Sequence, residues 1–242
     1  MIPYSSNPTG LPVVKISIVI PTLNEEAAIG QLLCALRQLP ELCEIIVVDG
    51  GSSDGTTGIA TTAAARVLRS ERGRGRQQAA GAAFATGDVL WFLHADCVPG
   101  PESLDAIRRA LGEAEVAGGN FELCFDGNGR PAHHLTLIYP WLRWLGLCYG
   151  DSGIFVRRSV YERVGGFRSL ALFEDLDLVR RVRKIGRFKT IDCRLTTSSR
   201  RFENRSFGLI FARWTLLQIL FWMGVHPDRL ARFYPAVRRA VK

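Results

Sequence analysis

Two stretches of the sequence decide the fold: Lys15–Glu26, which reads KISIVIPTLNEE, and Glu44–Asp54, which reads EIIVVDGGSSD. Each starts as a short run of β-branched and other apolar residues and then turns to small, polar and acidic ones. An apolar run of this length, bounded by turn residues, is typical of a strand buried on both faces. Between the two runs, residues 26–38 carry apolar side chains at helical spacing, so we expect a strand–helix–strand unit with parallel strands.

The same alternation continues along the first half of the chain. We expect a strand at Arg66–Arg69, a helix of small residues after the Arg72–Arg76 segment, and a strand at Asp88–Leu93. This order predicts an α/β fold with a mainly parallel sheet and helices on both of its faces. Further elements are expected at Val116–Phe125 (strand), Leu135–Leu147 (aromatic, helix-like), Gly150–Phe155 and Glu174–Ile185 (charged helix), followed by two closing helices. No linker-like stretch interrupts the chain, so we expect one domain over residues 1–242.

Composition narrows the class of protein. Apolar residues make up 47% of the 242 residues and charged residues 22%, which is the balance of a globular domain. The net charge of +8 is uneven, because 22 of the 31 Lys and Arg residues lie after residue 120. A basic half fits a polyanionic partner, such as nucleic acid, an anionic membrane surface or a phosphorylated substrate. The basic half fits equally well a second explanation, in which the arginines simply keep helix faces solvated.

The cysteines and the most apolar segment bear on compartment. The six cysteines form no Cys-x-x-Cys pair, so neither a zinc site nor a disulfide framework is expected. Since no signal peptide is recognised at the N-terminus, we expect reduced thiols and a cytoplasmic protein. Phe207–Met223 is strongly apolar but contains Arg213 and Gln218. It is also shorter than the roughly 20 apolar residues of a spanning helix, so we expect a core or interfacial helix there.

Polar clusters follow three of the expected strands. They are Asn24-Glu25 after the first strand, Asp49–Asp54 after the second and His94-Ala95-Asp96 after the fourth. Ligands of such sheets bind beyond the carboxyl ends of the strands, so we expect a functional site at this edge. Carboxylates crowded into one cleft repel one another, and a divalent cation with substrate phosphates relieves that cost. The alternative is a set of separate capping or solvated acids.

Two further segments carry charges suited to chemistry. Gly73-Arg74-Gly75-Arg76 suits a phosphate at a helix start, through backbone N–H groups and guanidinium contacts. It is not a dinucleotide-binding fingerprint, because Gln78 stands where the third glycine is needed. The alternative interpretation of this segment is a solvated basic turn. Glu174-Asp175-Leu176-Asp177 opens a basic helix, where the acids can supply a general base or merely complement the helix dipole.

These residues together resemble the family 2 glycosyltransferases, which have the GT-A fold. The resemblance runs from about Ile16 to Phe188 and rests on five segments that occur in order. They are Ile20–Glu26, Val47–Thr56, Leu93–Asp96, Val164–Phe167 and Glu174-Asp175. The tail Thr197–Tyr234, with the His-Ala-Asp and Asp-Gly-Gly-Ser variants, resembles the subgroup of glycosyltransferases associated with radical-SAM or selenium proteins.

The resemblance implies a three-layer α/β/α sandwich and an inverting transfer of a sugar from a nucleotide-diphosphate sugar to an acceptor hydroxyl. It implies a nucleotide-sugar-binding half at residues 1–120, an acceptor and catalytic half at 121–200 and a helical extension at 201–242. Asp96 would ligate Mg²⁺ or Mn²⁺ on the diphosphate, and Asp175, steadied by Glu174, would deprotonate the acceptor. The donor-binding residues would be Pro21, Thr22, Asn24, Glu25, Asp49, Gly50, Ser52, Arg76, Gln78, His94 and Ala95, and the acceptor-side residues Asp151, Gly165, Gly166 and Phe167.

The sequence departs from the family pattern at two positions. Where the second motif usually has two aspartates, this chain has Asp49-Gly50, so one expected contact to the nucleotide base is missing. Where Asp-x-Asp is usual, it has His94-Ala95-Asp96. Either the metal depends on Asp96 alone, or His94 contributes a nitrogen ligand or a hydrogen bond.

Partners and alternatives follow from the same residues. The acceptor is expected to be a small hydroxylated metabolite or a lipid phosphate, and nucleic acid is not expected. The basic, aromatic C-terminal region fits peripheral contact with the inner face of a membrane, and it fits a core helix or a homodimer interface as well. A sugar-phosphate nucleotidyltransferase should carry a glycine-rich loop with a basic residue after the first strand, where Pro21–Glu25 stands instead. A non-enzymatic nucleotide-binding or nucleic-acid-binding module would not need Asp175.

Overall fold

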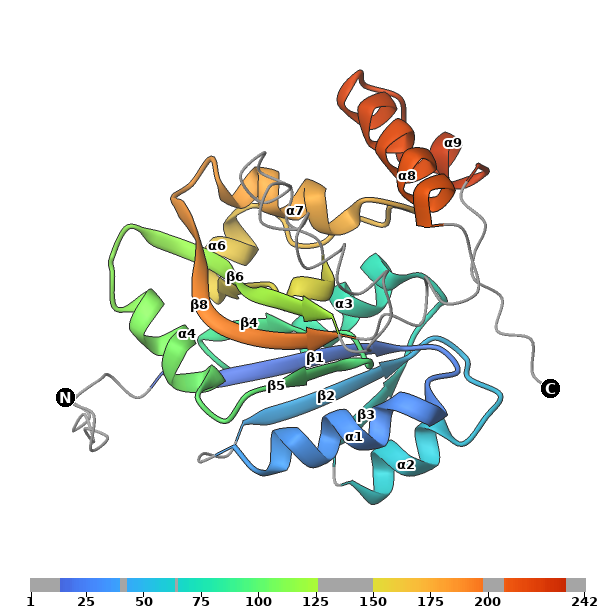
Figure 1. Cartoon of the computed structure of the whole chain (residues 1–242). Coiled ribbons are helices and arrows are strands. Elements are labelled where there is room, and N and C mark those ends of the chain that lie inside the picture. Colours follow the sequence, from blue (N-terminus) through green and yellow to red (C-terminus); the bar gives the residue numbers. More distant parts are fainter. Residues whose placement is uncertain (1–13, 40–42, 64, 126–149, 198–206, 234–242) are drawn as a thin grey trace.

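Eight strands form one curled sheet, and helices cover both of its faces in the computed structural model (Figure 1). The structure describes residues 14–39, 43–63, 65–125, 150–197 and 207–233. The strands are β1 (Ile16–Thr22), β2 (Glu44–Asp49), β3 (Arg66–Arg69), β4 (Val89–Phe92), β5 (Cys97–Pro99), β6 (Val116–Phe125), β7 (Phe155–Arg157) and β8 (Arg187–Thr197). The helices are α1 (Glu26–Arg37), α2 (Thr56–Thr62), α3 (Arg74–Phe84), α4 (Ser103–Leu111), α6 (Arg158–Arg163), α7 (Glu174–Val182), α8 (Phe207–Trp222) and α9 (Pro227–Ala231), with a short 3-10 turn, η1 (Gly150–Ser152).

The sheet order is β3-β2-β1-β4-β7-β6-β8-β5, and its two halves differ. The strands β3, β2, β1 and β4 run parallel, as the alternation of strands and helices predicts. Beyond β4 the sheet is mixed: β7 pairs antiparallel with β4 and β6, β8 runs parallel to β6, and β5 pairs antiparallel with β8. The α/β fold is therefore confirmed, with four neighbouring parallel strands in the half that the first 92 residues build and a mixed half beyond them.

Four elements were missed by the sequence patterns. After the charged helix only two helices were expected, but the chain first forms β8, the longest described strand, with 11 residues. The short strand β5 and the helices α4 and α6 were also not expected. Pro21 directly follows the apolar run of the first strand, yet it pairs with Val48 and the strand continues to Thr22. The expected Leu135–Leu147 stretch lies outside the described residues.

Two separate apolar cores show that the molecule has three layers. One face of the sheet buries Ile18, Ile20 and Trp91 with residues of α1, α2 and α4. The other face buries Val19 and Phe92 with residues of α3, α6 and α7. Because successive residues of β1 point to opposite faces, the unbroken apolar run of that strand fills both cores. The expected α/β/α sandwich is confirmed.

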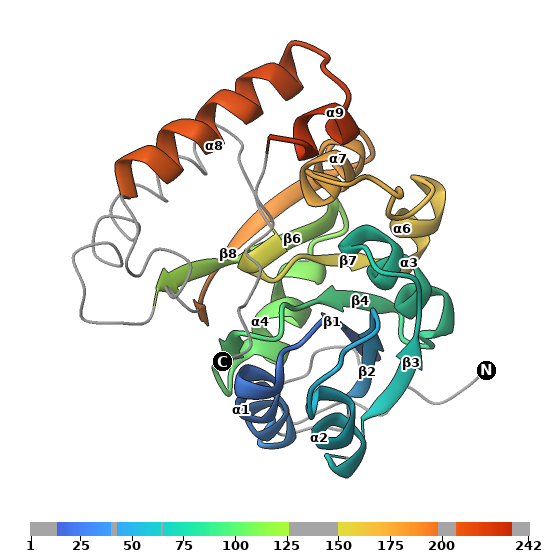
Figure 2. The same cartoon turned by 90° about the vertical axis from the view of Figure 1, so that its right-hand side faces the viewer.

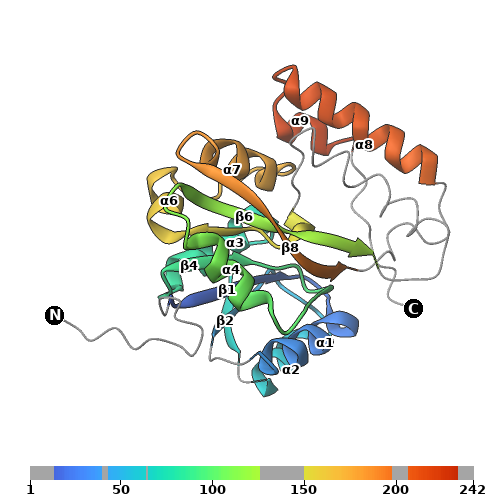
Figure 3. The ribbon, with the colours of Figure 1, turned by 60° about the vertical axis from the view of Figure 1, so that its left-hand side comes forward.

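The two C-terminal helices lie outside this sandwich. In Figures 2 and 3, α8 and α9 lie beyond α7, on the side of the molecule opposite α1 and α2. A third apolar cluster joins them to the rest: Leu217 of α8 and Leu230 of α9 pack with Phe173 and Leu176, which precede and begin α7. Within the described ranges, no helix is long and apolar enough to cross a membrane.

Candidate active site

The carboxylate of Asp49, at the end of β2, organises the loop that follows it. Its oxygens accept hydrogen bonds from the backbone N–H of Gly51 (3.0 Å), the backbone N–H of Ser52 (2.9 Å) and the Ser52 hydroxyl. The side chain is only 1% exposed. A buried carboxylate needs such donors, because an unpaired buried charge is costly. Asp49 therefore shapes the Gly50–Ser52 turn through its own hydrogen bonds.

Asn24 ties the loop after β1 to the loop after β2. Its backbone N–H donates to the Ser52 hydroxyl (2.9 Å), and its side-chain oxygen accepts from the backbone N–H of Ser53 (2.8 Å). The backbone N–H of Glu25 donates to the Thr56 hydroxyl (2.8 Å). The structure thus brings Asn24, Glu25 and Ser52 together at the carboxyl edge of the sheet, as their positions after adjacent parallel strands predict.

Asp54 fixes the start of α2 in the same loop. Its carboxylate accepts from the backbone N–H of Thr56 (3.1 Å) and from that of Glu26 (3.2 Å). Burial opposes ionisation of this carboxyl, but hydrogen bonds from Thr56 and Glu26 outweigh it and lower its pKa. The acid therefore serves to hold the two loops, which is the capping role that sequence alone allows for it.

Gln77, which the motifs did not single out, clamps the ends of β1 and β2. Its amide nitrogen donates to the carbonyl oxygens of Thr22 and Val48, both at 2.8 Å. A Cβ placed on Gly50 would lie 3.0 Å from the carboxamide carbon of Gln77. The space next to position 50 is therefore taken by Gln77, which accounts for glycine at the place of the family's second aspartate. The predicted Gln78 is buried on the same helix, and its side-chain oxygen has no hydrogen-bond partner among the described residues.

The start of α3 packs directly on the start of α7. A Cβ on Gly75 would lie 2.6 Å from the carbonyl oxygen of Arg168 and 3.3 Å from Cβ of Glu174, so only glycine permits this approach. Across the contact, Nε of Arg74 lies 3.5 Å from Oε1 of Glu174. The predicted phosphate-binding turn and the predicted catalytic pair, 100 residues apart in the chain, are thus neighbours in space.

Glu174 and Asp175 are both buried, with 4% and 6% exposure. Burial raises the pKa of Glu174, the nearby charge of Asp175 raises it further, and the Arg74 guanidinium lowers it in part. The Asp175 carboxylate accepts from the backbone N–H of Leu176 (2.8 Å). Two adjacent buried carboxyls beside one cation form a group that can take up a proton, which general base catalysis requires.

The backbone is strained next to both acidic clusters. In the described part of the chain, Asn24 and Phe173 are the residues other than glycine with a positive φ, 54° and 63°. Asparagine tolerates this conformation, but for phenylalanine it costs stability. These residues immediately precede Glu25 and Glu174. Strain of this kind gathers at functional sites, where the surroundings hold an unfavourable conformation in place.

Other charged residues of the two segments have different partners. Asp177 pairs with Arg181 (2.7 Å) and Arg168 (3.4 Å), so its carboxylate is neutralised by two arginines. Arg76 donates to the Ser169 hydroxyl (2.6 Å) and pairs with exposed Glu71 (2.6 Å). Arg74 is therefore the arginine of this turn that reaches the Glu174 carboxylate.

Cys97 lies beside two of the predicted acids. Asp96 is half-buried between β4 and β5, and Asp151 belongs to η1. Burial raises the pKa of the Cys97 thiol, and the charges of Asp96 and Asp151 raise it further. The Cys97 sulfur lies 3.5 Å from the Asp151 carbonyl oxygen. The predicted metal ligand and a predicted acceptor-side acid therefore both act on the same thiol.

The other residues predicted for the donor and acceptor sides mainly fill the core or shape the backbone. Ala95 lies in the core, 4% exposed, and the His94 carbonyl oxygen accepts from the backbone N–H of Cys97 (3.1 Å). Phe167 is buried with its ring edge-on to Phe92, at a centroid distance of 4.8 Å. Gly165 and Gly166 both have a positive φ, so they form a turn that other residues adopt only with strain. Within the described ranges, no three His, Cys, Asp or Glu side chains gather as a metal site.

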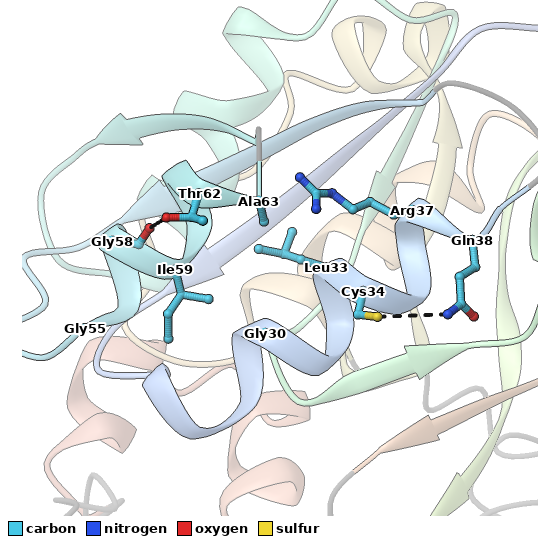
Figure 4. Close-up of a pocket in the computed structure, with 10 residues that line it drawn as sticks. All are labelled: Gly30, Leu33, Cys34, Arg37, Gln38, Gly55, Gly58, Ile59, Thr62 and Ala63. Atoms are coloured by element: carbon cyan, nitrogen blue, oxygen red, sulfur yellow. Dashed lines mark hydrogen bonds between the residues drawn. The ribbon is translucent and has the colours of Figure 1, made fainter.

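One hollow of about 650 Å³ opens between α1 and α2 (Figure 4). It is lined by Gly30, Leu33, Cys34, Arg37, Gln38, Gly55, Gly58, Ile59, Thr62 and Ala63. None of these residues belongs to the predicted site. The hollow arises where glycines on the two helices leave space, and the candidate site lies instead along the carboxyl edge of the sheet.

Comparison with known proteins agrees with this arrangement. Residues 17–169 match Glycosyl transferase family 2. The chain is 28% identical over 198 residues to the probable glycosyltransferase YdaM of Bacillus subtilis, covering 71% of this chain and 47% of YdaM. It is 32% identical over 215 residues to an undecaprenyl-phosphate 4-deoxy-4-formamido-L-arabinose transferase of Sodalis glossinidius, covering 84% of this chain and 65% of that protein. The chain thus spans about half to two thirds of the length of these relatives.

Solved structures show the same fold. The mannosyltransferase PcManGT of Pyrobaculum calidifontis, in complex with GDP-Man and Mn²⁺, superposes with a TM-score of 0.65 at 21% identity, covering 86% of this chain and 62% of that one. The GT-A fold is therefore confirmed. On the matched segment, the fold and the strand-end clusters, this chain belongs to glycosyl transferase family 2.

Proposed function

We propose that the enzyme transfers a sugar from a nucleotide-diphosphate sugar to an acceptor hydroxyl with inversion at the anomeric carbon, and that Asp175 is the general base. The observation that carries the proposal is the contact between the starts of α3 and α7. It places buried Glu174 and Asp175 beside Arg74, on the turn suited to a diphosphate. A base must lie within reach of the acceptor, next to the donor's leaving group.

The donor would occupy the carboxyl edge of the sheet. The loops after β1 and β2, which hydrogen bonds of Asn24 and Asp49 hold together, would take the nucleotide. Pro21, Thr22, Glu25, Gly50 and Ser52 belong to the same edge, and the turn with Arg74 and Arg76 would take the phosphates. The complex of PcManGT with GDP-Man supports a nucleotide-sugar donor.

Asp96 would hold a divalent cation on the diphosphate. Carboxylate oxygens are the ligands that Mg²⁺ and Mn²⁺ prefer, and these ions commonly bind one or two carboxylates with the substrate's phosphates. The half-buried Asp96 with Asp151 nearby fits this donor set, and the Mn²⁺ in PcManGT supports it. When bound, the cation supplies positive charge to the leaving diphosphate.

In the proposed chemical step, Asp175 is the residue that accepts the proton. The acceptor O–H proton passes to the Asp175 carboxylate as the acceptor oxygen bonds to the anomeric carbon. The bond from that carbon to the diphosphate oxygen breaks on the opposite side, and its electron pair leaves with the nucleoside diphosphate. Glu174, paired with Arg74, positions Asp175 and keeps the charge of the pair balanced. Burial of both acids keeps bulk water from competing for the proton.

The acceptor is proposed to be a small hydroxylated metabolite or a lipid phosphate. The relatives named as undecaprenyl-phosphate transferases support the lipid phosphate. Asp151 and the Gly165–Phe167 turn would lie on the acceptor side. We further propose a cytoplasmic protein, because the described cysteines form no disulfide. The His94–Asp96 and Asp49–Ser52 variants support membership of the radical-SAM or selenoprotein-associated subgroup. A homodimer remains an alternative for the C-terminal helices.

The test is nucleotide-sugar turnover, measured for a panel of UDP and GDP sugars with and without Mn²⁺. Asp175→Asn should lower the turnover rate by about 10²–10⁴-fold, the usual contribution of a general base. Asp177→Asn is the matched control on the same helix, and it should retain activity because Asp177 is held by two arginines. Asp96→Ala should raise the Mn²⁺ concentration that is needed. Full activity of Asp175→Asn would show that the base is assigned to the wrong residue.

A further inference from the structure

Helix α8 carries apolar side chains beyond the face that packs on the rest of the molecule. On the packed face, Leu217 and Phe221 join the cluster that holds Phe173. Leu209 and Leu216, with Met223 just after the helix, recur every seven residues, about two helical turns, and are 74%, 56% and 74% exposed. A helix that is apolar all round needs a second partner, and the described residues cover only one side of this one.

The exposed apolar side chains of the described residues are concentrated on the segment that contains α8 and α9. Apart from Phe84 and Ile185, every large apolar side chain that is exposed lies between Leu209 and Phe233. Ile219, Trp222 and Phe233 are further exposed apolar side chains of this segment. A hydrogen bond from the Arg213 guanidinium to the Phe233 carbonyl oxygen ties α8 to the residues just after α9. Large apolar side chains exposed together in one segment indicate an interaction site.

The charges around these side chains select their partner. Residues 207–222 contain no acid, and their one charged residue is Arg213. Arg229 and Arg232 are exposed on α9 and at its end. The acid of α9, Asp228, accepts from the backbone N–H of Ala171 (3.2 Å) and lies 3.6 Å from His226. A second copy docked by two-fold symmetry would bring these arginines toward their own counterparts, whereas anionic lipid headgroups would neutralise them.

We propose that α8 and α9 form an interfacial anchor that lies flat on an anionic lipid surface. Leu209, Leu216 and Met223 enter the boundary between headgroups and acyl chains, and Arg229 and Arg232 contact the headgroups. The 16 residues of α8 are fewer than a spanning helix needs, and an apolar stripe with flanking cations is the usual composition of an interfacial helix.

The anchor is in contact with the segment that carries the proposed base. The ring of Phe221 lies 5.0 Å, centroid to centroid, from the ring of Phe173, the residue before Glu174. A lipid surface on α8 therefore lies one helix layer from Asp175. This last consequence rests on the proposed function, and it favours an acceptor that is carried in the lipid headgroup layer. Lipid binding itself does not depend on turnover.

Flotation of the full chain with vesicles tests the anchor, without donor or acceptor. Vesicles of phosphatidylcholine alone are compared with vesicles in which part of it is replaced by phosphatidylglycerol. The wild type should bind the anionic vesicles, and added salt should weaken binding because it screens the charges. The double variant Leu216→Ser/Met223→Ser should bind about a hundredfold more weakly, since each of the two apolar side chains lost from the interface costs about tenfold.

Matched variants separate the anchor from general surface effects. Phe84→Ser removes an exposed apolar side chain from α3 (54% exposed, against 56% for Leu216) and should bind like wild type. Arg229→Gln/Arg232→Gln should lose binding to the anionic vesicles, whereas Arg109→Gln on α4 should not. Circular dichroism verifies that each variant is folded, and Asp175→Asn should bind vesicles normally even if it has no activity.

Two results overturn the proposal. One is a wild-type chain that fails to float with anionic vesicles. The other is a dimer, measured by light scattering, that Leu216→Ser/Met223→Ser dissociates while vesicle binding is absent or unchanged. Loss of turnover in Asp175→Asn leaves the anchor untouched, so the failure of the proposed base and the failure of the anchor give different results.

Discussion

At the scale of single residues, Arg74 links the donor turn to the candidate base through its contact with Glu174. Arg74→Gln removes the cation that lowers the pKa of Glu174, so the Glu174 carboxyl should hold its proton more tightly. The acidic limb of the kcat/KM profile against pH should move to higher pH, and the rate near neutral pH should fall. Turnover measured across the pH range checks this.

Arg76→Gln is the matched control for this variant. Arg76 lies two residues away on the same turn, but its partners are Ser169 and Glu71. Its loss should raise the KM for the donor if it binds phosphate, and it should leave the acidic limb where it is. An equal shift in both variants would mean that the charge of the whole turn, rather than the Arg74–Glu174 contact, sets the profile.

The sequence motifs predicted which residues lie at the candidate site, but they did not predict all of the contacts there. Asn24, Asp49 and Ser52 do meet at the carboxyl edge, because parallel strands end there together. The contact from Gln77 to the strand carbonyls could not be predicted, since it depends on the depth at which α3 packs on the sheet. That depth is set by Gly81, where a Cβ would lie 2.4 Å from a Val19 methyl.

At the scale of elements, the approach of α3 to α7 depends on Gly75. Gly75→Ala would force its methyl group against the Arg168 carbonyl oxygen, 2.6 Å away, so the two helix starts must separate. We expect about 1–3 kcal/mol of lost stability, measured by urea unfolding, and a larger loss of turnover because Arg74 and Glu174 move apart.

Gly58→Ala provides the comparison for that substitution. Gly58 lies within α2, and a Cβ there meets no atom within 4 Å. Alanine should raise the unfolding free energy by roughly 0.5–1 kcal/mol, the usual difference from glycine inside a helix. If Gly75→Ala were equally stabilising, the close contact between α3 and α7 would not be present in solution.

The strands differ in how clearly the sequence predicts them. The strands of the parallel half are continuous apolar runs, and they were predicted because both of their faces are covered. Strand β8 was missed because it alternates: Ile191, Cys193 and Leu195 point into the core, while Asp192 and Arg194 are exposed. Alternation of apolar and polar residues is a strand signal. In β8 the polar positions include charged residues and the strand follows a charged helix, so the strand was not recognised. Strand β5 has three residues, too few for any pattern.

At the scale of the whole molecule, two glutamates give the stability opposite dependences on pH. The pKa of Glu174 is raised by its burial, so the protein loses stability as the pH rises through that pKa and an ion must be buried. Burial also opposes ionisation of Glu44, but hydrogen bonds from Ser17 and Thr86 outweigh it and lower the pKa. Its contribution is present at neutral pH and is lost as the pH falls through the lowered value.

Substitution by glutamine separates the two effects. Glu174→Gln should raise the unfolding free energy at neutral pH, because no ion then has to be buried, with the gain shrinking in acid. Glu44→Gln should lower the unfolding free energy at neutral pH, with the loss shrinking in acid. Urea unfolding across the pH range measures both. A loss of stability in Glu174→Gln at neutral pH would mean that its pairing with Arg74 outweighs its burial.

The pairing of β5 with β8 also sets the order in which the protein can be completed during synthesis. Cys97 pairs with Thr197, so the edge of the sheet beside Asp96 is built from chain segments that leave the ribosome 100 residues apart. At about 5–20 residues per second, the parallel half is available seconds before β8 exists. The segments of the proposed nucleotide edge are therefore synthesised first and the strand beside the proposed metal ligand last, so a nascent chain that ends before β8 carries the first without the second.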